Sequence, residues 1–475
     1  ADALVNPAAL EVCDGLDNDC DGEADEGLVG YLDQDGDGFG VGDEQCIDDA
    51  PVATVDGDCD DADPAMHPYN PEVFDGLDND CDEAVDELRV WDATTVWTED
   101  ATEYCAGEMV TAVGETLVIG GFCAELGWTY SPGRAWFVDP SATGEQPLDD
   151  AVYLYGGGNE AVGKGSVALS DSQVALSAGL SWWVGQTQDP HIYVIDLPVT
   201  QTGQASDAAV ATITGVSGND LLVVTQGYDV DADGDADLLA TARGYPDWDG
   251  SAFVFNGPLS GNHGYNDADL RVAGENGSCE EIVHLHAGEE GLLVSGYGYG
   301  SSGCWGYHGA VRYFADVPTG TVQSTDADLS IVGSESQVRI GASVAFYDWD
   351  GDGTEEILAG TYEDIYLFEA GLSGTVSEED ATWVIQGVNT LTLEDGHLFL
   401  GNTRKGELLL YSVPEDPPAY YTGWYLPQEV AALHLVEEPW FGDSIALTDG
   451  MLWVGSPGNT DKQQPGFVYG FPWGF

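Results

Sequence analysis

Aspartates at alternate positions, followed by a glycine, recur in this sequence and are suited to binding a divalent cation. The most complete run spans residues 33–44, where loop positions 1, 3, 5 and 12 are acidic, position 6 is glycine and position 7 offers a backbone carbonyl. Ca²⁺ prefers such oxygen ligands, and the glycine permits the sharp turn around the ion. We therefore expect a complete calcium loop, closed by two oxygens of its last residue, with the ligands Asp33, Asp35, Asp37, Phe39 and Glu44.

Two shorter loops of the same kind lie much later in the chain, and each runs directly into an apolar stretch. Both offer side chains at positions 1, 3, 5 and 9 and a carbonyl at position 7, which is enough to hold one ion between neighbouring strands. The candidate ligands are Asp229, Asp231, Asp233, Asp235 and Asp237 in the first, and Asp348, Asp350, Asp352, Thr354 and Glu356 in the second.

Less complete acidic loops fill the rest of the first 90 residues. So many carboxylates with so little apolar material would repel one another unless cations neutralised them. The alternative is a solvated acidic linker, but a linker gives no reason for residues 10–21 to recur as residues 71–82. The further candidate ligands are Asp14, Asp17, Asp19, Asp21 and Asp25, then Asp56, Asp58, Asp60 and Asp63, then Asp75, Asp78, Asp80, Asp82 and Asp86.

Eight of the nine cysteines fall into sequence-local pairs that indicate disulfides, with no zinc-type Cys-x-x-Cys spacing. Spacing does not prove connectivity. Cys81 is left over, because Phe74 replaces the first cysteine of its repeat, and a buried, a free and an intermolecular thiol stay open for it. The expected pairs are Cys13 with Cys20, Cys46 with Cys59, Cys105 with Cys123, and Cys279 with Cys304.

The charge balance limits the partners. The chain carries 86 Asp and Glu against 10 Lys and Arg, a formal net charge of −76. So negative a surface repels nucleic acid and anionic membranes, and no apolar run is long enough to span a bilayer. We expect neither a nucleic-acid partner nor a membrane span. The cysteine pairs, and a first residue other than Met, favour a mature, exported chain.

Residues 91–475 form a second region of short β-branched and aromatic runs broken by glycine, without a helical period. A phrase that begins Asp-Ala recurs every 50 to 60 residues or so, the period of propeller blades, at Asp150, Asp207, Asp267, Asp326 and Asp380. Seven matched strands follow at residues 135–138, 192–195, 252–255, 311–314, 365–368, 408–411 and 467–469.

These patterns predict an all-β protein in which a seven-bladed β-propeller (residues 91–475) follows a small, loop-rich region stabilised by disulfides and calcium (residues 1–90). Residues 88–97 are expected to complete the last blade, which removes the open edge of the ring. The glycine-ended runs are expected to be the inner strands of their blades, at residues 116–121, 292–296, 357–360, 398–401 and 452–455.

Two resemblances to known families agree with this division. Residues 10–88 resemble the metal-binding motif repeats of secreted myxobacterial-type proteins, with their signature Cys-Asp-Gly-x-Asp-Asn-Asp-Cys-Asp-Gly, although Phe74 and Glu83 depart from it. Residues 94–475 resemble the FG-GAP repeats of integrin-α-type propellers, in the two calcium loops and at residues 244–246, 340–345 and 441–446. The resemblances imply a secreted, calcium-binding cell-surface protein, of bacterial origin.

Catalytic groups are sparse. His284 and His286 point to one side of a strand and could hold a transition metal, but no third ligand stands nearby in the sequence. Residues 298–303 match a dinucleotide-binding fingerprint by letters alone, without a helix to follow them. We therefore expect no enzyme.

The function we expect is adhesion, or the binding of an extracellular protein or glycan, by a calcium-loaded protein at the cell surface. The alternative is a structural subunit of a calcium-stabilised extracellular filament or surface layer, in which copies of the chain assemble with one another.

Overall fold

The computed structural model divides the chain into two compact units, which are described separately. One comprises Ala1–Leu88 with Trp473–Phe475, and the other Arg89–Pro472. The structure describes residues 5–7, 9, 12–25, 29–46, 51–70, 77–82, 93–99, 106–121, 132–157, 160–179, 189–215, 222–243, 249–296, 298, 307–349, 352–394, 397–402, 407–411, 424–425, 431–436, 444–448, 450–457 and 465–473.

The smaller unit contains a four-stranded sheet in the order β3-β1-β2-β4. Strands β1 (Val29–Leu32) and β2 (Phe39–Cys46) form an antiparallel hairpin around the first acidic loop. Strand β3 (Val52–Ala53) pairs with β1, and β4 (Val55–Asp56) runs parallel to the start of β2. The segment that follows β4 is therefore brought beside the loop.

Polar side chains dominate the interior of this unit. Among its described residues the buried apolar side chains are Ala53 and Met66. The buried polar ones are more numerous: Asn18, Asp33, Asp58, Asp61 and Asn79. Because buried carboxylates are costly unless a counter-charge compensates them, apolar burial alone does not account for this fold.

The disulfide pairs of the smaller unit differ from those expected. Cys13 is bonded to Cys46 and Cys59 to Cys81, whereas Cys20 is free and exposed. The predicted pairs Cys13–Cys20 and Cys46–Cys59 were therefore wrong, and Cys81 is not the cysteine left over. The reason is strand register: β2 runs back along β1, so the end of the hairpin lies beside the segment that precedes β1.

The larger unit is built from strands and a few single helical turns. The helical turns are η2 (Leu148–Asp150), α1 (Ala205–Ala208), η3 (Tyr265–Asp267), η4 (Ser324–Asp326) and η5 (Glu378–Asp380). The strands are β5 (Thr95–Thr98), β6 (Met109–Val113), β7 (Thr116–Gly121), β8 (Arg134–Val138), β9 (Gly144–Pro147), β10 (Val152–Tyr155), β11 (Val162–Ser170), β12 (Gln173–Ala178), β13 (His191–Asp196), β14 (Gly203–Gln204), β15 (Ala209–Thr214), β16 (Leu222–Tyr228), β17 (Asp237–Ala242), β18 (Ser251–Phe255), β19 (Gly261–Gly264), β20 (Leu270–Ala273), β21 (Ile282–Gly288), β22 (Gly291–Gly296), β23 (Ala310–Phe314), β24 (Gly320–Gln323), β25 (Leu329–Val332), β26 (Ser343–Tyr347), β27 (Glu356–Gly360), β28 (Asp364–Phe368), β29 (Gly374–Val376), β30 (Trp383–Gln386), β31 (Thr390–Glu394), β32 (His397–Asn402), β33 (Glu407–Tyr411), β34 (Trp424–Tyr425), β35 (Ala431–Val436), β36 (Ser444–Thr448), β37 (Met451–Ser456) and β38 (Phe467–Pro472).

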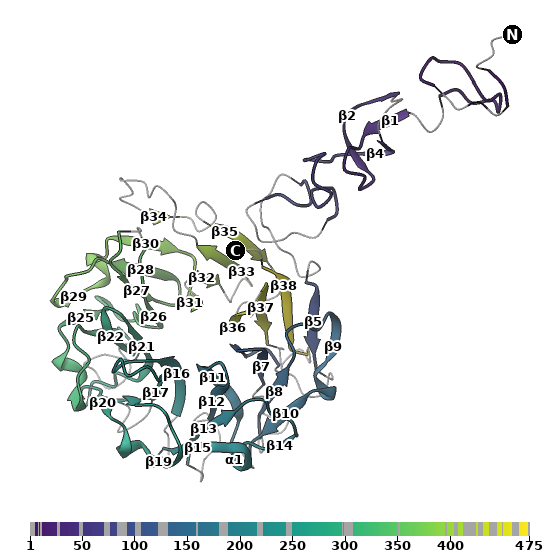
Figure 1. Ribbon diagram of the computed structural model, residues 1–475. Helices are drawn as coiled ribbons and strands as arrows, with labels where there is room; N and C mark the ends of the chain where they lie inside the picture. The colour runs from purple at the N-terminus through teal and green to yellow at the C-terminus, as the bar shows by residue number, and fades with distance from the viewer. Residues whose placement is uncertain are drawn as a thin grey trace. The chain divides into compact units, whose positions relative to one another are not determined.

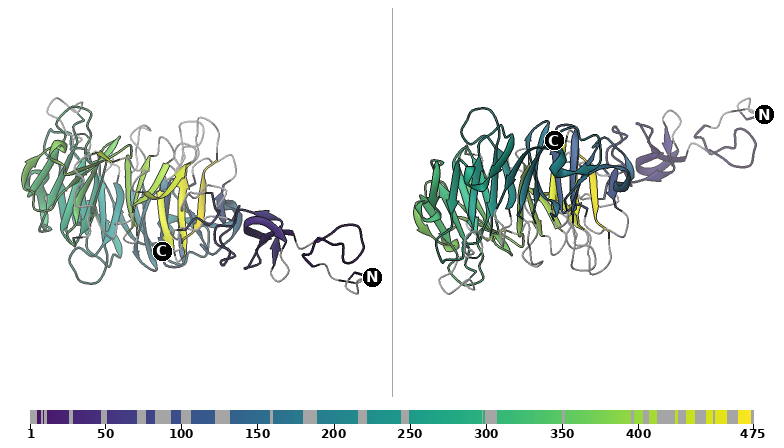
Figure 2. Two further views of the ribbon diagram at one scale, coloured as in Figure 1. Left: turned by 90° about the horizontal axis from the view of Figure 1, so that it is seen from above. Right: turned by 90° about the horizontal axis from the view of Figure 1, so that it is seen from below.

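Within the described residues these strands form seven sheets, arranged around a centre in Figure 1. The first strands of the sheets, β6, β11, β16, β21, β26, β31 and β36, each contact the first strand of the next sheet, and β36 contacts β6, which closes the ring. Seen from above and below in Figure 2, the strands of this unit run between its two faces. The all-β prediction is confirmed, and the arrangement is that of a propeller-like ring.

The last sheet is closed by a strand from the beginning of the unit. Strand β5 pairs antiparallel with β38, with Trp97 opposite Val468. The expectation for residues 88–97 is therefore met where the structure describes them. Six of the seven sheets in the described residues gain a fifth strand from the next sheet: a short strand that follows a third strand, such as β19, pairs in parallel with the fourth strand of the preceding sheet, here β15.

The glycine-ended runs lie inside their sheets, one strand out from the centre of the ring. They form β7, β22, β27, β32 and β37, which are the second strands of their sheets. Second strands are flanked on both edges and covered on both faces, so they read as continuous apolar runs, whereas the first strand β11 is half-exposed over much of its length. The apolar cores lie between neighbouring sheets, where for example Val194 packs with Leu238 and Phe253.

The repeated Asp-Ala phrase proves to be a turn that precedes the fourth strand of a sheet. In three of the repeats the aspartate accepts the backbone N–H of the residue three positions earlier. These bonds join Asp267 to Gly264 (2.7 Å), Asp326 to Gln323 (2.9 Å) and Asp380 to Ser377 (2.8 Å). The phrase therefore has a structural role. None of the described helices is both long enough and apolar enough to cross a membrane.

Candidate metal centres

Four acidic loops share one hydrogen bond that shapes them before any ion binds. In each, the carboxylate at position 1 accepts the backbone N–H of the glycine at position 6, and that glycine has a left-handed φ of 87° to 109°. The pairs are Asp17 with Gly22 (3.0 Å), Asp33 with Gly38 (3.3 Å), Asp229 with Gly234 (2.9 Å), and Asp348 with Gly353 (3.0 Å). The backbone therefore curls around the point to which the aspartates turn.

Carboxylates converge in four places among the described residues. In each group the potential ligand oxygens lie within 4.8 Å of one another. Two such charges repel by about 1 kcal/mol even at the dielectric constant of water, and more when water is excluded. A cation between them would turn this repulsion into attraction. The groups are Asp17, Asp19 and Asp21; Asp33, Asp35 and Asp37; Asp78, Asp80 and Asp82; and Asp229, Asp231 and Asp237.

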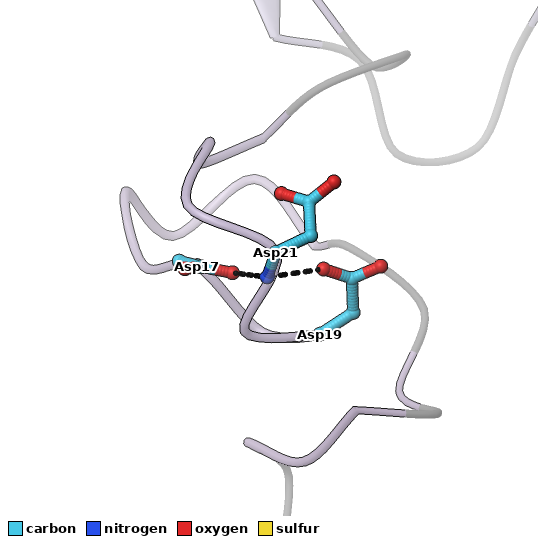
Figure 3. Close-up of side chains that lie close together, drawn as sticks. All are labelled: Asp17, Asp19 and Asp21. Atoms are coloured by element: carbon cyan, nitrogen blue, oxygen red, sulfur yellow. Dashed lines mark hydrogen bonds between the residues drawn. The ribbon is translucent and has the colours of Figure 1, made fainter.

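The two copies of the repeat place their aspartates alike. Figure 3 shows the first copy, in which the backbone nitrogen of Asp21 donates to both Asp17 and Asp19, at 3.1 Å each. In the second copy the nitrogen of Asp82 donates to Asp78 and Asp80, at 3.1 and 3.2 Å. Both loops are exposed in part. The predicted ligands Asp75 and Asp86 lie outside the described residues.

Two further aspartates of the first copy bond to the backbone beside it. Asp14 accepts the N–H of Leu16 at 2.9 Å, and Asp25 accepts those of Asp14 and Gly15 at 3.2 and 3.1 Å. Neither belongs to the carboxylate groups that converge within 4.8 Å in the described chain. Their hydrogen bonds support the backbone of the loop.

The loop of residues 33–38 is the most enclosed of the acidic loops in the smaller unit. The side chain of Asp33 is 5% exposed. One oxygen each of Asp35 and Asp37 is buried without a hydrogen-bond partner. Burial, and then the neighbouring carboxylates of Asp37, Asp33 and Asp61, raise the pKa of Asp35. Enclosed carboxylate oxygens without donors are what a bound cation would satisfy, so these residues fit a metal site.

Glu44 does not close this loop, contrary to the prediction. It lies on β2, exposed, five residues beyond Phe39. A strand advances by about 3.3 Å per residue, which carries Glu44 roughly 16 Å from the loop. Its neighbour is Tyr31 instead, whose pKa is raised by Asp56, by burial, and by Glu44 and Asp43. A calcium loop with a ligand at position 12 is normally followed by a helix. Here residues 39–46 form strand β2 instead, so Glu44 is not brought back to the loop.

Phe39, predicted to offer its carbonyl, begins β2. Its N–H donates to Asp37 at 2.7 Å, and its ring stacks on that of His67 with 4.8 Å between centroids. This position keeps the backbone of residue 39 at the rim of the loop.

The predicted loop of Asp56, Asp58, Asp60 and Asp63 does not form as one site. In the described chain these four carboxylates do not converge. Asp56 is exposed on β4, and Asp60 and Asp63 each cap a turn by accepting the N–H two residues ahead. Asp58 is buried instead, because its N–H follows β4 along the start of β2 and reaches the carbonyl of Gly40 at 3.4 Å.

Asp61 is a buried residue that the sequence did not single out. Its two oxygens accept the backbone and side-chain N–H groups of Gln34, at 2.7 and 2.6 Å. Calcium loops are recognised by aspartates at every second position, and Asp61 lies three residues after Asp58, outside that pattern. Asp61 also contacts a loop that lies 27 residues earlier in the chain. A prediction of metal-ligating residues from local spacing could not identify this contact.

The two loops of the larger unit each connect the first and second strands of a sheet. Asp237 starts β17 fully buried, and its oxygens accept the N–H groups of Val230 and Gly257, both at 2.8 Å. Burial raises the pKa of Asp237, although these donors oppose the shift. Asn256 donates to Asp231 at 2.6 Å. The loop is thus held on both sides by its own sheet.

The second of these loops repeats that geometry at the start of β27. Glu356 is buried and accepts the N–H of Trp349 at 2.8 Å, as Asp237 does for Val230. One oxygen of Asp348 is buried without a hydrogen-bond partner. Asp352 accepts the N–H of Thr354 at 2.8 Å, as Asp233 does that of Asp235 at 2.9 Å. Asp350 lies outside the described residues.

The histidine pair is half-buried on β21 of the larger unit. Burial lowers the pKa of His284, and burial together with the charge of His284 lowers the pKa of His286 to about 4. The ring of His286 lies 5.8 Å from that of Phe346 on the next sheet. No histidine joins a metal-type cluster in the described part of the chain.

The remaining predicted disulfides fall mostly beyond the described residues. Cys279 is disulfide-bonded. Cys105, Cys123 and Cys304 lie outside the described residues, so the two pairs predicted for the larger unit stay predictions.

Comparison with known proteins supports the metal-binding character of the smaller unit. A family labelled Cu-binding MopE and described as "Putative metal-binding motif" matches residues 1–26 and 58–87. No curated protein matches the sequence. Among solved structures, the WD40 domain of coronin from Toxoplasma gondii is similar, with 10% sequence identity, a TM-score of 0.45, and coverage of 80% of this chain and 87% of that chain. The smaller unit thus matches a metal-binding motif, and the strands of the larger unit form an all-β, propeller-like ring.

Proposed function

We propose that this is a secreted, calcium-binding cell-surface protein that binds an extracellular protein or glycan, in adhesion or recognition. The observation that carries the proposal is the shared bond from a position-1 carboxylate to a position-6 glycine. It occurs in both units, at Asp33 in the smaller and at Asp229 in the larger. The disulfides of the smaller unit fit an extracellular protein.

The donor chemistry favours Ca²⁺ over copper as the bound metal. Each converging group consists of aspartate oxygens, the ligands of hard cations. Copper prefers imidazole and sulfur ligands, and the converging groups in the described chain contain neither. Calcium sites of extracellular modules work at about 10⁻⁴ to 10⁻³ M, so these loops are suited to a calcium-rich medium.

The larger unit is proposed to be a seven-bladed propeller of the FG-GAP, integrin-α-like type. Seven sheets in the described residues, a closed ring of first strands and two calcium-type loops between first and second strands support it. In this arrangement calcium stiffens two sheets, and strand packing holds the others. The loops between sheets are left to contact a protein or glycan, without a catalytic role.

Assembly into a calcium-stabilised filament or surface layer is the second candidate. The observation that favours it is Cys20, a free and exposed thiol within the acidic loop of residues 17–22. The net charge of −76 adds a second means, because divalent ions would bridge the carboxylates of neighbouring copies. The thiol and the bridging ions together would link neighbouring chains.

Removal of calcium tests the proposal. Chelation is expected to lower the melting temperature and to loosen residues 12–82 first, because the smaller unit has little apolar core. Differential scanning calorimetry and hydrogen exchange, each with Ca²⁺ and with chelator, measure this. Equal curves would contradict calcium binding, and stabilisation by copper but not calcium would reassign the metal. Light scattering in the same buffers separates the candidates: a calcium-dependent polymer favours assembly, an unchanged monomer favours partner binding.

A further inference from the structure

The loop of residues 33–38 lacks an acidic residue at position 9, which is Val41. In both loops of the larger unit that position is filled by a buried carboxylate, Asp237 or Glu356, which accepts the N–H of the residue at position 2. In the first of them, Asp237 is also one of the converging ligands. The same bond would therefore mark a ligand position in the loop of the smaller unit.

Asp61 makes that bond in the smaller unit. The N–H of Gln34, at position 2, donates to Asp61 at 2.7 Å, compared with 2.8 Å in each loop of the larger unit. The carboxylate that local sequence omits is thus supplied by a segment 27 residues later. Asp61 is 9% exposed, so it is enclosed as the position-9 residues are.

Asp58 brings a further oxygen to the same place. Its side chain is 9% exposed, and one oxygen is buried without a hydrogen-bond partner, like one oxygen each of Asp35 and Asp37. The other oxygen is held by the N–H of Asp60 at 2.8 Å, which fixes the carboxylate. The charges that act on Asp58 are those of Asp37, Asp35 and Asp61. Asp35, Asp37 and Asp58 thus each have one buried oxygen without a hydrogen-bond partner, and Asp58 comes from a different segment of the chain. Asp58 and Asp61 are not among the carboxylates whose oxygens converge within 4.8 Å of one another, so the ion would have to draw them in.

We propose that Asp58 and Asp61 complete a calcium site with Asp33, Asp35 and Asp37. Asp58 is a direct ligand in the place predicted for Glu44, and Asp61 takes position 9. The bound ion joins the β1–β2 hairpin to the segment after β4. This inference rests on the calcium-binding function proposed above and adds which residues form its most enclosed site.

The site predicts that one substitution changes stability in opposite directions with and without metal. In chelator, Asp58→Asn removes a buried, unpartnered negative charge beside two others, so it is expected to raise the melting temperature of the smaller unit. In Ca²⁺ it removes a ligand, so the affinity of this site is expected to fall tenfold or more and the melting temperature to fall. Asp61→Asn, which retains an acceptor for Gln34, is expected to weaken calcium binding by about tenfold.

Hydrogen exchange of the full-length chain, titrated with Ca²⁺, measures both effects at residues 33–40. Residues 229–237 in the same chains report calcium binding elsewhere. The matched control is Glu44→Gln, which removes one charge from the predicted but distant position and is expected to leave the titration of residues 33–40 unchanged.

Two results would overturn the inference: loss of calcium protection at residues 33–40 in Glu44→Gln but not in Asp58→Asn, or a shift of Asp58→Asn in the same direction with and without Ca²⁺. If residues 229–237 respond to Ca²⁺ in these experiments, the proposed function stands and only the ligand assignment fails. If neither segment of the unaltered chain responds, the proposed function itself fails.

Discussion

At the residue scale, the carboxylates of these loops do two things at once. Asp229 accepts the N–H groups of Asp233 and Gly234, at 3.0 and 2.9 Å, while it turns toward Asp231 and Asp237. The backbone donors fix the side chain before an ion arrives, so less order must be created on binding. Removal of such a carboxylate therefore affects the fold as well as the metal.

Asp237→Ala tests the structural part of this dual role. The substitution leaves the half-buried N–H groups of Val230 and Gly257 without their acceptor, which costs up to about 1 to 3 kcal/mol each. We expect the free energy of unfolding in chelator to fall by about 2 to 5 kcal/mol, measured by denaturant titration. Asp235→Ala, an exposed change in the same loop, is the control and should cost less than about 0.5 kcal/mol. Equal effects of the two would refute the structural role of Asp237.

At the scale of elements, the packing of one sheet on the next decides what a side chain can do. His286 stands on β21 and faces Phe346 of β26. Although the sequence offered it as a metal ligand, burial between sheets keeps its ring neutral. Because protonation of this half-buried imidazole is disfavoured in the folded protein, the contact between the sheets is sensitive to acid.

The pH dependence of stability should show this histidine. Its pKa of about 4 in the folded protein is below the ordinary 6.5, so the unfolded chain takes up the proton first as the pH falls. The contribution to stability is complete above pH 6.5 and is lost between there and about pH 4, by up to about 3 kcal/mol. The free energy of unfolding is to be measured at pH 7 and at pH 4.5, for the unaltered protein and for His286→Phe. The variant is needed because carboxylates also titrate between these two pH values. An identical acid loss in the variant would exclude His286 as its source.

At the scale of the whole molecule, the ring depends on a strand from the start of the larger unit. Strand β5 gives β38 its outer partner, and Trp97 is buried with Trp453 and Val468 in the core between the last sheet and the first. Without β5 the edge of β38 would be open to pairing with another chain. Closure of the ring thus joins residues that lie more than 300 positions apart.

Removal of β5 is expected to open the ring. A chain that starts at residue 100 should melt at a lower temperature and self-associate through the exposed strand edge, as followed by calorimetry and size-exclusion chromatography. A chain that starts at Arg89 keeps β5 and serves as the control. If both chains stay monomeric and melt together, the ring does not depend on β5.

Much of this protein could be predicted from local patterns. The position-1 aspartates and position-6 glycines of four loops, among them Asp229 and Gly234, could be recognised in the sequence, because a calcium-type turn is formed by about six consecutive residues. The seven third strands of the ring could be recognised in the same way, since a strand that lies between two others is a continuous run of apolar residues. Such features depend on neighbours in the chain.

The contacts that tertiary structure decided are those between segments far apart in the chain. The register of β1 and β2 set the bond of Cys13 to Cys46, and the parallel pairing of β4 with β2 brought Asp58 to Gly40 and the segment that follows, with Asp61, to Gln34. The extended strand β2 itself carries Glu44 away from the loop. Spacing along the chain shows which residue types could bind a cation. Which of them meet is decided by strand pairing, because a strand of a few residues moves a side chain farther than a metal–oxygen bond can reach.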